Sequence, residues 1–109
     1  MDIEPISNDA DTERLLRIVI WDLTRFFDYS AADAEEAVRS FYARWQSSRG
    51  DDFYHHEGAF RSASMIHYLA THRSTTDFNG FVEWYRAQNF TDAEREALAY
   101  FRDNYFVHP

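Results

Sequence analysis

The chain has 109 residues, 45% of them hydrophobic, and a net charge of −8 because 19 acidic residues outnumber 11 basic ones. This length fits one domain with a real core, and the excess of carboxylates disfavours direct binding to nucleic acid or to an anionic membrane surface. The sequence contains neither cysteine nor lysine, which excludes disulfides, thiolate metal sites, a cysteine nucleophile, Schiff-base chemistry and a P-loop lysine.

Neither a membrane span nor a secretion signal is visible in the sequence. No apolar run approaches the roughly 20 residues of a membrane-spanning helix, and the acidic start, residues 1–5, lacks a basic region followed by an apolar stretch. We therefore expect a cytoplasmic protein in which residues 1–9 form a flexible acidic lead-in and residues 10–109 a single helical domain.

The segment 11–28 has the periodicity of an amphipathic helix that Asp11 can cap. Its apolar residues share one broad face: Leu15, Leu16, Val19, Ile20, Leu23, Phe26 and Phe27. Ile18 and Trp21 fall on the opposite side, among three arginines. Two interpretations are open: a central helix covered on both sides, or a partner-binding surface anchored by Trp21.

Two further helices are predicted in the middle of the chain. Ser30 and Asp33 resemble a capping box at the start of a helix over 31–48. Its apolar face consists of Ala34, Val38, Phe41, Tyr42 and Trp45. The next helix is predicted over 52–73, where Gly58 either kinks the first turn or marks the true start.

The last two helices are predicted over 77–88 and 92–105. Asp77 ends a polar turn and can cap the first of them, and Thr91 with Glu94 forms a capping box for the second. The core face of the final helix is expected to contain Ala97, Leu98, Phe101 and Tyr105. No segment alternates as a strand does, so the fold class is all-α, a compact bundle or orthogonal array of about five helices.

Most arginines have a carboxylate three or four residues away on the same predicted helix. Examples are Glu13 with Arg17, Asp22 with Arg25, Glu35 with Arg39, and Glu83 with Arg86. Such spacing predicts ordinary solvated ion pairs worth a few tenths of a kcal/mol each, rather than a phosphate-binding cradle.

The segment 51–57, DDFYHHE, is where a metal or catalytic site would be sought first. Asp52 with His55 or His56 has the spacing of ligands on one helical face, but no third ligand is marked and the zinc-protease helix motif is absent. His67 lies on one stripe with His56, but at about 1.5 Å per residue the two are too far apart to share an ion. We therefore expect neither a metal nor another cofactor.

The leading hypothesis for function is a small acidic protein-binding module. Its type would be a bacterial immunity protein or antitoxin that covers the basic cleft of a toxin or nuclease-like partner by steric and electrostatic occlusion. The partner-binding candidates are Asp51, Asp52, Tyr54, Glu57, Ile18 and Trp21.

Two alternatives come from other classes of function. The first is a metal-assisted or acid–base enzyme built on Asp52, His55, His56 and Glu57. The second is a self-associating scaffold subunit, a homo-oligomer held together by exposed Trp21 and Trp84.

Overall fold

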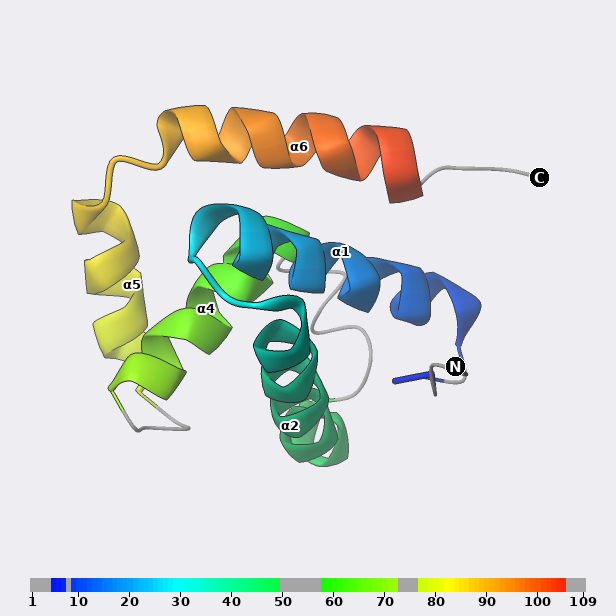
Figure 1. The fold of residues 1–109 in the computed structure, drawn as a ribbon. Helices are drawn as coiled ribbons and strands as arrows, with labels where there is room; N and C mark the ends of the chain where they lie inside the picture. Colours follow the sequence, from blue (N-terminus) through cyan, green and yellow to red (C-terminus); the bar gives the residue numbers. More distant parts are fainter. Residues whose placement is uncertain (1–4, 8, 50–57, 73–76, 106–109) are drawn as a thin grey trace.

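Five α-helices make up most of the residues that the structure describes. The computed structural model describes residues 5–7, 9–49, 58–72 and 77–105, with only the backbone for residues 45–49. The helices are α1 (Ala10–Phe26), α2 (Ala31–Arg49), α4 (Ala59–Thr71), α5 (Phe78–Ala87) and α6 (Thr91–Tyr105). Within these ranges there is no strand, which confirms the all-α prediction (Figure 1).

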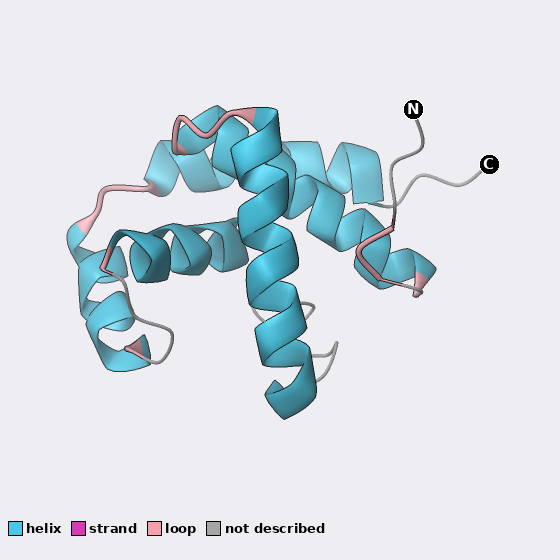
Figure 2. Ribbon diagram, turned by 60° about the horizontal axis from the view of Figure 1, so that its bottom comes forward, coloured by secondary structure: helices cyan, strands magenta, loops and turns pink. Residues whose placement is uncertain are grey.

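Helix α1 lies at the centre of the array and contacts α2, α4 and α6. Helix α6 runs antiparallel along one side of α1, while α2 crosses it steeply, so the helices form an array rather than a parallel bundle (Figures 1 and 2). Asp9 begins α1, because its carboxylate accepts hydrogen bonds from the Thr12 backbone N–H at 2.9 Å and from the Thr12 hydroxyl at 2.7 Å. The expected cap at Asp11 was therefore two residues too late.

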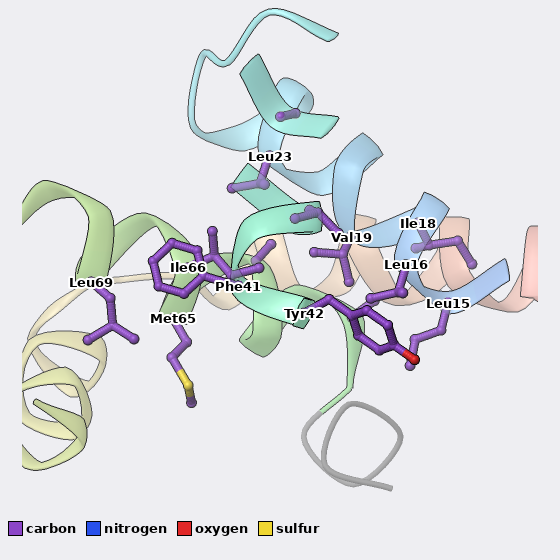
Figure 3. Packing of buried hydrophobic residues seen from close by; sticks show 14 of the residues in the cluster. Leu15, Leu16, Ile18, Val19, Leu23, Phe41, Tyr42, Met65, Ile66 and Leu69 are labelled. Atoms are coloured by element: carbon purple, nitrogen blue, oxygen red, sulfur yellow. The ribbon is translucent and has the colours of Figure 1, made fainter. Parts of the chain in front are cut away.

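The core forms where α1, α2 and α4 meet, as Figure 3 shows. Its largest fully buried aliphatic side chains are Leu15, Leu16, Val19 and Leu23 of α1, Val38 of α2, and Ile66 and Leu69 of α4. All four residues from α1 belong to the apolar face predicted from periodicity, and the Ser30 hydroxyl caps α2 by accepting from the Asp33 N–H at 3.1 Å. Local patterning thus places these two helices correctly.

Helix α4 begins at Ala59 rather than at the predicted residue 52. Gly58 precedes it with φ 84° and ψ 163°, a backbone conformation that an L-residue rarely adopts and that cannot continue a helix. Of the two roles considered for Gly58, marking the start of the helix is the correct one.

Helix α5 is joined to α4 by a hydrogen-bonded node around Asp77. The Asp77 carboxylate accepts from the Gly80 N–H at 3.1 Å, which caps α5, and from the Tyr68 hydroxyl of α4 at 2.8 Å. A Cβ at Gly80 would overlap both the Asp77 carboxylate and the Tyr68 hydroxyl. A glycine is required here because the cap and the tyrosine approach the backbone closely.

Gly80→Ala is therefore expected to destabilise the protein although alanine is the better helix former. Displacing Asp77 and Tyr68 should lose the cap and the interhelix bond, at roughly 1–3 kcal/mol in the free energy of unfolding. Urea unfolding of Gly80→Ala against Asn79→Ala, an exposed neighbour in the same turn, measures this. Equal stability of the two variants would contradict it.

Candidate functional site

The acidic and histidine cluster that the sequence singled out lies outside the described residues. Its members are Asp51, Asp52, Tyr54, His55, His56 and Glu57. The partner-binding and metal-binding hypotheses for this cluster remain predictions. In the part of the chain that is described, no group of three or more histidines and carboxylates could hold a metal ion.

Ile18 and Trp21, the other two partner-binding candidates, are both covered in the fold, and Trp21 lies against α6. Ile18 is 3% exposed, and the half-buried Trp21 ring stacks on Tyr100 with centroids 3.7 Å apart and an interplanar angle of 5°. The structure thus matches the interpretation in which α1 is covered on both sides. In this arrangement Ile18 offers almost no surface to a partner.

A groove of about 590 Å³ opens where the start of α4 and the end of α5 meet α6. Its lining is mostly apolar and includes Ala59, Phe60, Tyr85, Ala97, Leu98 and Phe101. The volume falls in the range of roughly 300–1,000 Å³ that ligand and peptide sites commonly have. Because the groove combines three segments distant in sequence, no local pattern could have indicated it.

Leu98 stands at this groove with 60% of its surface exposed, and it is the one exposed large hydrophobic residue in the described ranges. The sequence placed Leu98 on the core face of the last helix, and that placement was wrong. The adjacent Ala97 is the residue of α6 that is buried. The helix is thus turned so that Leu98 lies beside the groove and in contact with solvent.

One wall of the groove is held by an interaction between α5 and α6. The Tyr85 hydroxyl donates to Glu94 at 2.8 Å, and the Arg61 guanidinium lies 5.0 Å from the Tyr85 ring centroid. Burial, followed by the hydrogen bond to Glu94, raises the pKa of Tyr85, so the phenol stays neutral at physiological pH. Tyr85 is therefore suited to shaping the groove rather than to acting as a base.

An aromatic cluster supports the groove from below and joins α1, α4 and α5. The Phe60 ring lies 5.3 Å from Phe26 and 5.3 Å from Phe90, and Trp84 lies 5.8 Å from Phe90. Trp84 also contacts His67 at 6.2 Å. The half-buried Trp84 thus packs within the fold, and the groove has a rigid base of rings.

His67 lies in the same cluster and is part of the packing. Its ring stacks on Phe27 with centroids 4.7 Å apart, and its Nδ1 is 3.3 Å from the Tyr29 hydroxyl. Burial, and then the neighbouring His72, lowers the pKa of His67 and favours the neutral ring. No described nucleophile is paired with this histidine, so its geometry is that of a structural residue.

Carboxylates dominate the exposed surface of the described residues. Eleven acidic side chains are exposed: Asp9, Asp11, Asp28, Asp33, Glu36, Asp77, Glu83, Asp92, Glu94, Glu96 and Asp103. Five arginines are exposed: Arg25, Arg44, Arg86, Arg95 and Arg102. The exposed surface of the described residues therefore carries a clear excess of negative charge.

The half-buried arginines Arg17 and Arg39 form ion pairs with carboxylates of the same fold. Arg17 bonds Glu13 at 2.8 Å and Glu35 at 2.7 Å, and Arg39 bonds Glu35 at 3.2 Å. Hydrogen bonds from Arg17 and Arg39 lower the pKa of Glu35. At Glu13 burial raises the pKa, but hydrogen bonds from backbone N–H groups and from Arg17 outweigh this effect, so the pKa of Glu13 is also lowered. These pairs confirm the predicted spacing and join α1 to α2.

Asp22 breaks the same pattern. Its predicted partner, Arg25, instead bonds Glu96 of α6 at 2.5 Å, and Asp22 is fully buried with neither carboxylate oxygen hydrogen-bonded. Burial alone raises the pKa of Asp22 to about 8. The Ser62 hydroxyl of α4 is likewise buried without a hydrogen-bond partner. A buried polar group without a partner is rare and needs a physical account.

Comparisons of the chain with protein-family models, with curated proteins and with solved structures find no match. None of the helices in the described ranges combines the length and apolarity needed to cross a membrane. The features from which a function can be inferred are the groove, the surface charge and the buried carboxyl group of Asp22.

Proposed function

We propose that this chain is an acidic protein-binding module whose partner is basic. The observation that carries the proposal is Leu98, a large apolar side chain left exposed beside an apolar groove. Burying an exposed leucine against a partner gains on the order of 1.5–3 kcal/mol. An apolar anchor within a charged rim is the usual anatomy of a protein interface.

The charge of the surface supports the choice of a basic partner. Exposed carboxylates outnumber exposed arginines by eleven to five in the described part of the chain. Such a field attracts a positively charged surface, speeds association and disfavours acidic competitors. Occlusion of a basic cleft, as by an immunity protein or antitoxin, needs only this complementarity and no chemistry.

Self-association is the other function that an apolar groove supports, with Leu98 of one copy in the groove of another. The version of this idea that used Trp21 and Trp84 has less support, since both rings are half-buried in aromatic contacts. Sedimentation at micromolar concentration separates the two functions. A monomer is expected for the inhibitor, and a dimer disrupted by Leu98→Asp is expected for self-association.

The binding test uses the product of the adjacent reading frame, because inhibitors and their targets are commonly encoded side by side. Titration calorimetry is expected to show a complex that Leu98→Asp weakens at least about tenfold, a loss of about 1.4 kcal/mol. Ala32→Asp, which adds the same charge at an exposed position of α2 away from the groove, is the matched control and should retain affinity.

Salt dependence tests the electrostatic part of the same proposal. Affinity should fall steadily between low and physiological ionic strength, since exposed charges are screened over about 8–10 Å. If Leu98→Asp binds as tightly as the parent, or if no basic protein binds at all, the proposed function is wrong.

A further inference from the structure

Helix α6 covers α1 mainly through half-buried side chains, since Tyr100, Phe101 and Tyr105 pack partly buried against the core. Only Ala97 of its 15 residues is buried. Along α1 it is held by the stack of Tyr100 on Trp21, by Glu96 bonded to Arg25 at 2.5 Å, and by the Tyr105 carbonyl, which accepts from Arg14 at 3.0 Å. The two ionic and polar contacts lie at the surface or half-buried, so the net docking free energy of α6 is small compared with that of a core helix.

The face of α1 under this cover is defined by spacing along the helix. Arg14, Ile18, Trp21 and Arg25 recur at three- and four-residue steps, which places them on one stripe. Three of the four contact α6 directly, and Ile18, the fourth, is buried. Ile18 is therefore enclosed because α6 is docked.

Helical spacing places Asp22 on α1 between the stripe that contacts α6 and the residues that face α4. Arg25 and Phe26 follow Asp22 by three and four residues, so they lie one helical turn after it on the same side of α1. Arg25 bonds Glu96 of α6. The centroid of the Phe26 ring lies 5.3 Å from that of Phe60 of α4. The carboxyl group of Asp22 is completely buried, and it neither accepts nor donates a hydrogen bond. The spacing thus places Asp22 where α1 faces both α6 and α4, and no side chain in the described ranges bonds its carboxyl group.

The described titratable groups on the surrounding helices do not compensate a charge on Asp22. On the α1–α6 side, Arg25 and Glu96 neutralise each other and the Tyr100 ring stacks on Trp21.

On α4 the titratable side chains are directed to other elements. Arg61 lies over Phe81 and Tyr85 of α5. His67 contacts Phe27 and Tyr29, and Tyr68 bonds Asp77. Burial is accordingly the one cause of the shift that raises the pKa of Asp22 to about 8.

We propose that α6 is a proton-controlled cover on α1, docked most firmly while Asp22 is protonated and loosened when Asp22 ionises. Docking encloses a neutral carboxyl, and undocking returns it to water as a carboxylate, so docking takes up one proton. An exposed aspartate has a pKa of about 3.9, and the docking equilibrium therefore weakens about tenfold per pH unit from about pH 4 to about pH 8 and then levels off.

Loosening of α6 can occur without unfolding the other helices. Phe90, at the start of α6, stays packed on the rings of Phe60 and Trp84 and so provides a fixed attachment. Release of the remainder of α6 would expose Ile18, Trp21 and the charged Asp22 together. These include the two residues of α1 that the sequence marked as a partner surface.

Hydrogen exchange of the full chain between pH 5 and pH 8.5, with rates corrected for the intrinsic pH effect, tests the proposal. Protection of the α6 amides is expected to fall by about tenfold per pH unit from pH 5 to about pH 8 and then to level off, while α1, α2 and α4 stay protected. In Asp22→Asn the α6 protection should be independent of pH. Equal protection at both pH values in the parent, or the same fall in Asp22→Asn, would overturn the proposal.

A second variant tests the linkage from the opposite side and does not alter Asp22. Tyr100→Ala removes the stack on Trp21 and should loosen α6, so the pKa of Asp22, followed by carbon-detected NMR, is expected to fall toward the ordinary range. Arg102→Ala, an exposed position of the same helix, is the matched control and should leave that pKa raised. A raised pKa that persists in Tyr100→Ala shows that α6 does not enclose Asp22, and the proposal fails.

Discussion

Asp22→Asn is expected to raise the free energy of unfolding by up to about 5 kcal/mol at pH 8 and by only about 1 kcal/mol at pH 4.5. The reason is the burial of an unpaired carboxyl whose pKa is about 8 in the folded protein and about 3.9 in the unfolded chain. Below both values the carboxyl is neutral in either state, and asparagine, of nearly the same shape, changes little.

The sign follows from proton binding in the two states. Between about pH 4 and about pH 8 the folded state retains a proton that the unfolded state has lost, so stability falls by about 1.4 kcal/mol per pH unit. Glu13 and Glu35, whose pKa values are lowered by hydrogen bonds, act in the opposite sense, since their stabilisation is lost as pH falls below the usual carboxylate range. The parent should therefore be most stable near pH 5.

Urea unfolding at half-unit steps from pH 4.5 to pH 8.5 measures this difference. Asp33→Asn removes the same charge at an exposed position of α2 and serves as the control for net charge. Parallel stability curves for the parent and Asp22→Asn would show that Asp22 ionises freely in the folded state. Because loosening of α6 relieves the buried charge, a decline that stops short of the full value would measure the docking free energy of that helix.

Phe81→Ala is expected to lower the free energy of unfolding by about 3–5 kcal/mol, the usual loss for a large aromatic in a core. Phe81 is the largest fully buried side chain in the described residues and the one fully buried residue of α5. Its ring centroid lies 5.9 Å from Tyr68, 6.1 Å from Trp84 and 5.6 Å from Tyr85. Removing it leaves a cavity that rigid neighbouring rings cannot fill.

The same substitution should disturb the groove, because Phe81 supports two residues of its wall. Arg61 lies 5.3 Å above the Phe81 ring and 5.0 Å above the Tyr85 ring, so both would lose their base. Denaturant unfolding gives the stability, with Val82→Ala, a half-buried neighbour on the same helix, as the comparison. If the two variants lose equal stability, Phe81 is not the anchor of α5.

The positions of α1 and α2 and the caps of α2 and α5 were predictable because they depend on nearby residues. The spacing of Leu15, Leu16, Val19 and Leu23 places them on one face in any environment, and all are buried. The side chain of Ser30 caps α2, and that of Asp77 caps α5, through bonds to amides three residues away. Such contacts close within one turn, so the sequence contains both partners and their separation.

Pairing beyond one turn could not be predicted in the same way. Asp22 and Arg25 have the spacing of an ion pair, yet Arg25 bonds Glu96, 71 residues away along the chain. Periodicity states which residues share a face but not which helix covers that face. This is also why Ile18 and Trp21 left two interpretations open until α6 was seen to lie over them.

By itself, then, the sequence determined an acidic, all-helical chain, the main apolar face of α1, the caps of α2 and α5, and the ion pairs Glu13–Arg17 and Glu35–Arg39. Only the tertiary structure decided that Leu98 is exposed, that a groove lies beside it and that Asp22 is buried without a partner. The physical reason is the distance along the chain over which the deciding interactions act. Caps and helical faces are set by hydrogen bonds and spacings within a turn or two, whereas exposure and pKa depend on which distant helix excludes water from a side chain.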